Sequence, residues 1–221
     1  MTENFKNRVM TSFLLLLLLY LIFFNNVIQL YFLLLIPIIA FIEFSKLTQK
    51  IFYKKKFLQL ISNIFFIVYI FCFAGIFFLS SQIIQLKLLF FLCLIICIAS
   101  DIGGLLFGKI FKGPKLTKIS PKKTISGSIG SFIFSLFIAL LCVSFTSFNF
   151  DFMQIFLLSI LVSTGSQLGD IFFSYLKRKA RVKDTGKILP GHGGILDRID
   201  GILFGIPFGL FLTVLLHGIF L

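Results

Sequence analysis

Residues 9–42 read VMTSFLLLLLLYLIFFNNVIQLYFLLLIPIIAFI and contain no Asp, Glu, Lys or Arg. A helix needs about 20 apolar residues to cross the hydrocarbon core of a bilayer, so this stretch is too long for one crossing. Asn25 and Asn26 interrupt it near its middle, as residues of a tight turn would. The segment therefore predicts a helical hairpin, with one span near 9–25 and a second near 27–45.

Long apolar stretches recur along the rest of the chain. Residues 57–86 and 124–150 also lack charged side chains, and 58% of the 221 residues are hydrophobic whereas only 13% are charged. Because an open strand edge cannot stay unpaired in lipid, we expect these stretches to be helices. The sequence predicts an all-α polytopic integral membrane protein of seven spans, the other five near 57–80, 83–107, 128–148, 152–176 and 200–220.

The positive charge is distributed unevenly between the predicted loops. If the N-terminus is cytoplasmic, 20 of the 21 basic residues fall on the cytoplasmic side, and only Lys87 falls on the other. Cytoplasmic loops of membrane proteins carry such an excess of Lys and Arg. We therefore expect a cytoplasmic N-terminus and a C-terminus on the outer side. Insertion alone can explain the basic cluster at 46–56, but the lysines of the two later loops alternate with Gly, Ser, Thr and Pro, as in phosphate-binding loops.

Three carboxylates lie within or at the ends of apolar spans, where a charge is costly. Asp101 precedes Lys109 by about 12 Å of helix and Asp170 precedes Lys177 by about 10 Å, so both lie at a similar depth and could face one cavity. Each could instead form an ion pair with a lysine from a neighbouring helix end. Glu43 adjoins the basic 46–56 loop, and we expect it to form an interfacial ion pair.

The polar segment 174–200 is expected to bind anions and metal at the membrane surface. Asp197 and Asp200 share one helix face if the last helix begins nearby, and Mg²⁺ prefers oxygen ligands from carboxylates and phosphates. The Gly191-His192-Gly193-Gly194 turn could bring backbone N–H groups close to a phosphate, although it fits neither the Walker nor the dinucleotide pattern. Nucleic acid is not an expected partner, because aromatic residues do not alternate with basic ones outside the spans.

Segment 174–200 resembles the signature of the phosphatidate cytidylyltransferases, also called CDP-diacylglycerol synthases. The shared residues are Ser174, Leu176, Lys177, Arg178, Lys183, Asp184, Gly186, Leu189, Pro190, His192-Gly193-Gly194-Ile195 and Asp197-Arg198-Ile199-Asp200. The resemblance extends upstream to Ser100-Asp101-Ile102-Gly103, Gly108-Lys109, Ile119-Ser120-Pro121-Lys122-Lys123-Thr124 and Gln167-Leu168-Gly169-Asp170.

The resemblance implies that CTP and phosphatidate react at the cytoplasmic face of a membrane, expected to be a bacterial inner membrane, with Mg²⁺ or another divalent cation. It implies catalytic roles for Asp170, Asp197, Asp200, Lys183 and His192, with Asp170 and Asp197 as metal ligands. The substrate-binding residues it implies are Asp101, Lys122, Lys123, Ser174, Lys177, Arg178, Gly193, Gly194 and Arg198. A homodimer is also implied.

The expected organisation is a single membrane domain over residues 1–221. It comprises N-terminal spans at 1–98, a catalytic region at 99–200 with cytoplasmic loops 108–128 and 177–200, and a last transmembrane helix at 201–221.

The chain departs from the family pattern at two positions where relatives carry Glu, since it has Phe173 before the signature serine and Ser126 after the Pro-Lys-Lys-Thr motif. Two alternatives stay open. One is a CTP-dependent enzyme acting on another lipid phosphate or on a lipid alcohol. The other is a catalytically silent membrane subunit of the same fold.

Overall fold

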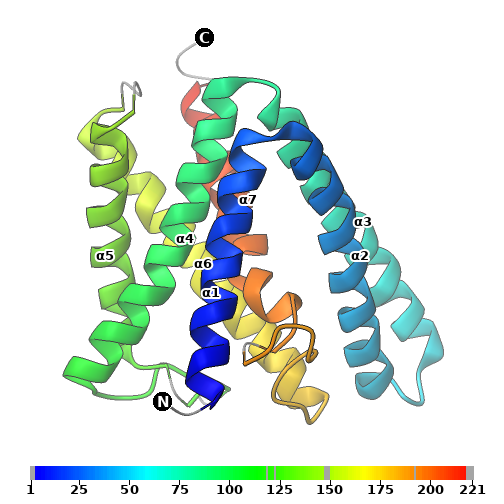
Figure 1. Cartoon of the computed structure of the whole chain (residues 1–221). Coiled ribbons are helices and arrows are strands. Elements are labelled where there is room, and N and C mark those ends of the chain that lie inside the picture. The colour runs from blue at the N-terminus through cyan, green and yellow to red at the C-terminus, as the bar shows by residue number, and fades with distance from the viewer. Residues whose placement is uncertain (1–2, 118, 122, 147–149, 192, 218–221) are drawn as a thin grey trace. The chain divides into compact units, whose positions relative to one another are not determined.

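The structure, a computed structural model, describes residues 3–117, 119–121, 123–146, 150–191 and 193–217. Seven helices account for most of these residues (Figure 1), and the described part of the chain contains no β-strand beyond two isolated bridges. The helices are α1 (Glu3–Phe24), α2 (Asn26–Ile51), α3 (Lys56–Ser81), α4 (Ile84–Phe111), α5 (Ile125–Ser144), α6 (Phe152–Lys179) and α7 (Leu196–His217). The predicted all-α fold is confirmed.

The predicted turn between the first two helices is also confirmed. Asn25 is the N-cap of α2, and its side-chain oxygen accepts hydrogen bonds from the N–H groups of Val27 at 2.9 Å and Ile28 at 3.1 Å. These donors have no partner inside the helix, so a capping side chain satisfies them where the chain reverses. The hairpin thus follows from one polar residue within an apolar run.

Within the part of the chain that the structure describes, five helices, α2 to α6, are long and apolar enough to cross a membrane. In α1 the apolar part, Val9–Phe24, is shorter. Many apolar side chains of these helices are exposed on the surface of the protein, as is expected of residues that face lipid. In α3, for example, Phe65 and Leu79 are 73% and 69% exposed. These features support an integral membrane protein, while the count of seven crossings stays a prediction.

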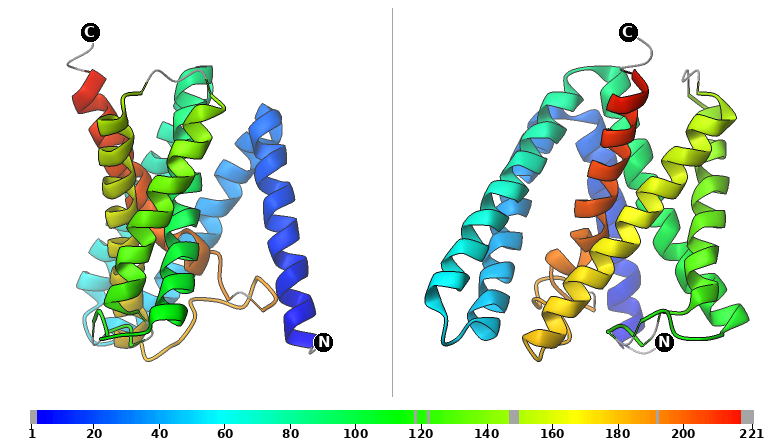
Figure 2. Two further views of the ribbon diagram at one scale, coloured as in Figure 1. Left: turned by 90° about the vertical axis from the view of Figure 1, so that its left-hand side faces the viewer. Right: turned by 180° about the vertical axis from the view of Figure 1, so that it is seen from behind.

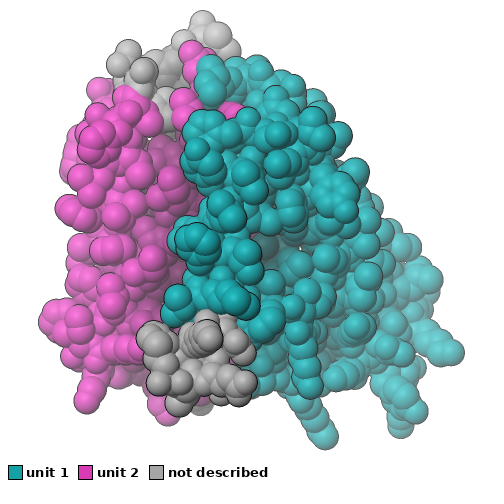
Figure 3. Space-filling model, viewed as in Figure 1, with its two compact units in different colours: residues 1–84, 176–199 teal, residues 85–175, 200–221 magenta. Residues whose placement is uncertain are grey.

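The chain divides into two compact units, coloured separately in Figure 3. Unit 1 comprises Met1–Ile84 and Leu176–Ile199, and unit 2 comprises Gln85–Tyr175 and Asp200–Leu221. In unit 1, α2 and α3 form an antiparallel pair (Figure 1), and the rings of Phe44 and Phe66 stack between them with centroids 3.9 Å apart.

Unit 2 is built from α4, α5, most of α6 and most of α7, which lie side by side in both views of Figure 2. Glycines allow these helices to approach closely. A Cβ placed on Gly103 of α4 would lie 2.6 Å from the carbonyl oxygen of Gly130 in α5, and one on Gly165 of α6 would lie 2.9 Å from Cα of Gly205 in α7. Small residues at the contacts are typical of helix packing in membranes, where close van der Waals contact replaces the hydrophobic effect.

We expect Gly103→Ala to destabilise the protein, because the added methyl group would meet backbone atoms of α5 that cannot rotate away. Overpacking of this kind costs about 1–3 kcal/mol. Since the chain has no Trp, unfolding is best followed in detergent by a thiol-reactive dye that labels the buried Cys93 and Cys97 as they become exposed.

Gly75→Ala is the matched control for this substitution. A Cβ on Gly75 would meet nothing within 4 Å, and alanine is the better helix former, so the melting temperature should stay constant or rise. Equal melting temperatures for the two variants would contradict the close packing of α4 against α5.

Candidate functional site

A cavity of about 290 Å³ with charged and polar side chains in its lining lies in unit 2. Asp101 of α4 and Asp170 of α6, expected from their similar depth to face one cavity, both line it. The remaining lining residues come from α4, α5, α6 and the segment that precedes α5: Ser100, Gly104, Leu105, Leu116, Ser120, Lys123, Thr124, Gly127, Ser128, Ser131 and Gln167. Two carboxylates and an ammonium group therefore meet in one cavity among apolar helices.

Lys123 and Asp170 form an ion pair across this cavity. The distance from Lys123 Nζ to Asp170 Oδ2 is 2.7 Å, and both side chains are partly exposed, by 27% and 21%. The loop holds Lys123 in place, because its carbonyl accepts from the N–H of Leu116 at 2.8 Å and the next residue, Thr124, caps α5 through the N–H of Gly127 at 3.1 Å. The lysine partner foreseen for a carboxylate within an apolar span is thus present at Asp170.

A chain of hydroxyl and amide groups borders the same cavity. Ser100 and Ser163 lie 2.8 Å apart through their hydroxyl oxygens, and Ser131 donates to the Ser100 carbonyl at 2.7 Å. Ser128 donates to Gln167 Oε1 at 2.5 Å. Ser131 and Ser163 are not among the predicted site residues, since serines within apolar spans are also common at helix contacts that have no functional role.

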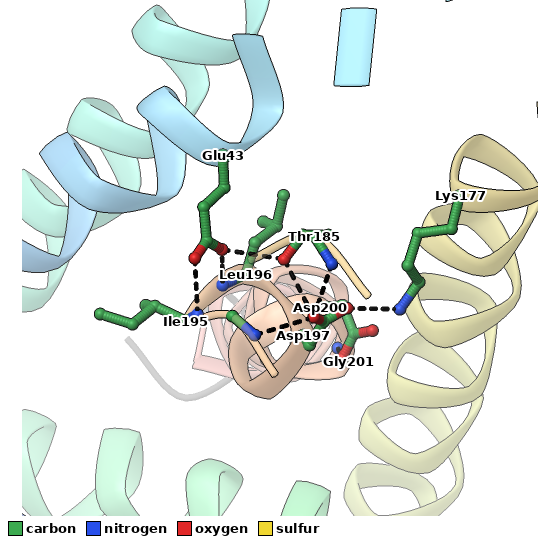
Figure 4. A network of polar contacts seen from close by, with 9 residues as sticks. Glu43, Lys177, Thr185, Ile195, Leu196, Asp197, Asp200 and Gly201 are labelled. Carbon is green, nitrogen blue, oxygen red and sulfur yellow. Dashed lines mark hydrogen bonds and ion pairs between the residues drawn. The ribbon is translucent and has the colours of Figure 1, made fainter. Parts of the chain in front are cut away.

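In unit 1, hydrogen bonds of the signature segment converge on Asp197. This residue lies in the first turn of α7, and its side chain is only 5% exposed. Its Oδ1 accepts from Lys177 Nζ at 2.7 Å. Its Oδ2 accepts from the N–H of Thr185 at 2.8 Å, from the Thr185 hydroxyl at 3.0 Å and from the N–H of Gly194 at 3.0 Å. Figure 4 shows these contacts converging from α6, the loop and α7.

The charge state of Asp197 follows from these partners. Burial opposes its ionisation, but the hydrogen bonds from Lys177 and from the N–H groups of Gly194 and Thr185 outweigh this and hold the pKa of the carboxyl below its ordinary value. Asp197 is therefore a carboxylate at neutral pH.

The glycine turn has a backbone that only glycine adopts readily. Gly191 has φ +75° and Gly193 has φ +84°, and the N–H of Leu189 donates to the Gly193 carbonyl at 2.9 Å to close the turn. A Cβ on Gly193 would also lie 2.9 Å from Asp197 Oδ2. His192, a predicted catalytic residue, lies outside the described residues, as does Lys122.

Glu43 corrects one prediction. The expected ion pair with lysine is not found among the described residues: Glu43 is 2% exposed, and neither the Lys123–Asp170 pair nor the Lys177–Asp197 pair includes it. Its Oε2 accepts from the Thr185 hydroxyl at 2.9 Å and from the N–H of Leu196 at 2.8 Å, and its Oε1 accepts from the N–H of Ile195 at 3.2 Å. The partners of Glu43 are therefore neutral donors that lie about 150 residues away in sequence. The prediction of an ion pair relied on the lysines nearest in sequence, at 46–56, and so did not identify these donors.

The other predicted residues have differing exposure. Lys183, Arg178 and Arg198 are exposed, and Ser174 is half-buried. Asp200 Oδ1 accepts from the N–H of Gly201 at 3.0 Å. Phe173, one of the departures from the family pattern, is 2% exposed and packs its ring edge-on against Phe204, so this position contributes to the core of unit 2.

The cavity of unit 2 has two carboxylates, Asp101 and Asp170, in its lining. Among the described residues no group of three His, Cys, Asp or Glu is placed to hold a metal ion. Mg²⁺, however, commonly binds through one or two carboxylates together with substrate phosphates and water, and Asp101 and Asp170 fit this pattern. At Asp197 both oxygens are already hydrogen-bonded, so a cation at Oδ1 would have to displace Lys177.

Comparison with known proteins agrees with the signature. A family model described as the cytidylyltransferase family matches residues 2–216. The phosphatidate cytidylyltransferase of Staphylococcus haemolyticus is 45% identical over 109 residues, which are 49% of this chain and 42% of that protein. That of Rickettsia felis is 41% identical over 122 residues, which are 52% of this chain and 54% of the relative. The chain thus spans about half the length of the curated relatives it matches.

We expect Asp197→Asn to lower the stability of the protein at neutral pH by about 1.5–3 kcal/mol, because the charged hydrogen bond to Lys177 is lost. A carboxyl whose pKa is lower in the folded state stabilises the fold above its unfolded pKa and loses this contribution as the pH falls toward its folded pKa. The difference in melting temperature between the parent and Asp197→Asn should therefore narrow between about pH 5 and about pH 3.

Asp151→Asn, at an exposed acid before α6, controls for general effects of acid. A difference between parent and Asp197→Asn that stays constant over this pH range would contradict the described ionisation of Asp197.

Proposed function

The chain belongs to the cytidylyltransferase family, and from this membership we propose that it transfers the cytidylyl group of CTP to phosphatidate, giving CDP-diacylglycerol and pyrophosphate. Relatives named phosphatidate cytidylyltransferase support this choice of reaction. Phospholipid biosynthesis is the corresponding process.

The observation that carries the proposal is the cavity of unit 2, where Asp101, Asp170 and Lys123 meet. A triphosphate brings several negative charges, which need cationic partners before a further phosphate can approach. Lys123 is one such partner, and carboxylates become useful beside a triphosphate when they hold a cation. Mg²⁺ or another divalent cation, when bound at Asp101 and Asp170, would supply neutralisation of the triphosphate charge.

The proposed reaction is an in-line substitution at phosphorus. A phosphate oxygen of phosphatidate forms a bond to the α-phosphorus of CTP, and the bond from that phosphorus to the oxygen bridging to the β-phosphorus breaks, which releases pyrophosphate. Since the second pKa of a phosphate monoester is about 6, the nucleophile is already ionised at neutral pH and needs no dedicated base. The task of the chain is therefore to position both phosphates and to balance their charge.

Basic residues of the signature segment are proposed to bind phosphate groups. Lys183, Arg178 and Arg198 are exposed and so can reach an anionic group, whereas Lys177 is paired with Asp197. We propose that the exposed side chains bind the polyanionic substrates, whereas Lys177 stabilises the conformation of segment 174–200. The homodimer implied by the resemblance is retained as a proposal, which the mass of the detergent-solubilised particle would test.

The reaction is tested by pyrophosphate release from purified protein supplied with CTP, Mg²⁺ and phosphatidate. We expect release that requires both substrates, with CDP-diacylglycerol recovered, and little release when ATP replaces CTP. Asp170→Asn should lower the rate by about 10²-fold or more, because Lys123 loses its partner and the cavity loses a negative charge.

Asp151→Asn makes the same chemical change at an exposed position and should retain the parent rate. Turnover with another lipid phosphate or a lipid alcohol, but not with phosphatidate, would overturn the assigned substrate. Absence of turnover with all such lipids from folded protein would favour a catalytically silent subunit.

We also propose that the N-terminus and the basic loops face the cytoplasm, because cytoplasmic loops carry the excess of Lys and Arg. Green fluorescent protein fused after Lys54, Lys115 or Lys187 should fluoresce, and alkaline phosphatase fused after Gln82 or Asp151 should be active only outside the cytoplasm. The reverse pattern would refute this orientation.

A further inference from the structure

The carboxylate of Glu43 is surrounded by donors of the signature segment. It projects from α2, is 2% exposed and accepts three hydrogen bonds, from the Thr185 hydroxyl and from the N–H groups of Ile195 and Leu196. All of these residues belong to unit 1. Neither the signature nor the cavity of unit 2 includes Glu43, so the proposed function leaves this buried acid without a role.

Glu43 caps the N-terminus of α7 from a distant part of the chain. The first N–H groups of a helix have no partner within the helix, and a side chain next to them in sequence usually satisfies them. Here Leu196 begins α7, and the acceptor for its N–H lies 153 positions earlier. The positive end of the helix dipole further favours a carboxylate at this position.

Two glycines of the signature segment make room for this carboxylate. A Cβ on Gly186 would collide with Glu43 Oε1, and a Cβ on Gly194 would collide with Glu43 Oε2 and with the Thr185 hydroxyl. The space around Glu43 is therefore closely matched to an acid of this length.

Thr185 connects Glu43 to Asp197. Its hydroxyl oxygen lies 2.9 Å from Glu43 Oε2 and 3.0 Å from Asp197 Oδ2, and Figure 4 shows it between the two acids. A hydroxyl has one hydrogen to donate, so it serves one carboxylate at a time, while backbone N–H groups hold each acid independently. Asp197 in turn holds Lys177 at 2.7 Å.

We propose that Glu43 is a positioning residue for cytidylyl transfer, fixing the start of α7 and thereby Asp197, Lys177 and the glycine turn in their working geometry. This inference rests on the proposed function for its effect on rate. Its structural part, the cap on α7, does not depend on that function.

Glu43→Gln tests the proposal with almost no change of volume. The amide retains one acceptor oxygen and places an NH₂ group against donors, so at least one of the three donors loses its partner. We expect kcat and kcat/KM for CTP to fall together by about 10–100-fold, the loss typical of groups that orient reactive residues. Hydrogen exchange of the peptide covering 185–200 should become faster.

Phe44→Leu is the matched control. Phe44 neighbours Glu43 in α2, is 7% exposed and stacks on Phe66 of α3, so the change loosens the packing of α2 against α3 and removes none of the hydrogen-bond donors to Glu43. It should lower the melting temperature but leave kcat and the exchange of 185–200 at parent values. Thr185→Val combined with Glu43→Gln should cost less than the product of the single effects, because both remove one connection.

Equal losses of kcat in Glu43→Gln and Phe44→Leu would reduce Glu43 to general stability and overturn the proposal. Parent rate and parent exchange in Glu43→Gln would overturn it as well. If the parent itself does not convert CTP and phosphatidate, the proposed function fails, and hydrogen exchange alone still decides whether Glu43 caps α7.

Discussion

A carboxylate among apolar helices must be surrounded by donors, and both polar regions of this chain are built to meet that requirement. Asp170 is paired with Lys123, Asp197 accepts from Lys177 and from loop N–H groups, and Glu43 accepts from the start of α7. Asp170 and Asp197 thereby hold segments that lie between helices, and Glu43 holds the first turn of α7. The hydrogen bonds and ion pairs offset the cost of burying charge, and they also order the loops where we place the chemistry.

The helices could be predicted from the sequence because the signal is strong and local. Long apolar runs, three of them free of charge, identified all seven helices, and Asn25 marked the turn between α1 and α2. The ends were less predictable. Helix α6 continues to Lys179, beyond the expected end of its span near 176, because backbone hydrogen bonds can continue into the polar region after the apolar run ends.

The site was predictable where depth along a helix was the relevant variable, which placed Asp101 and Asp170 on one cavity. The partner of Glu43 was not predictable, since the nearest charges in sequence suggested lysines, whereas the tertiary fold supplies Thr185 and the N–H groups of α7. The contribution of Ser131 was missed for a related reason. The sequence alone does not distinguish a serine that borders a cavity from one that only contacts a neighbouring helix.

The fit of Glu43 between Gly186 and Gly194 also limits how this protein can vary over evolutionary time. A methyl group at either glycine conflicts with the present acid, and a shorter residue in place of the acid leaves a void with unpaired donors. Single replacements at any of the three positions are therefore disfavoured, and a side chain at position 194 conflicts with Thr185 as well as with Glu43. Substitutions at positions 43, 186 and 194 should therefore be correlated among homologous chains. Such a correlation would connect the N-terminal half, which carries no signature motif, with segment 174–200.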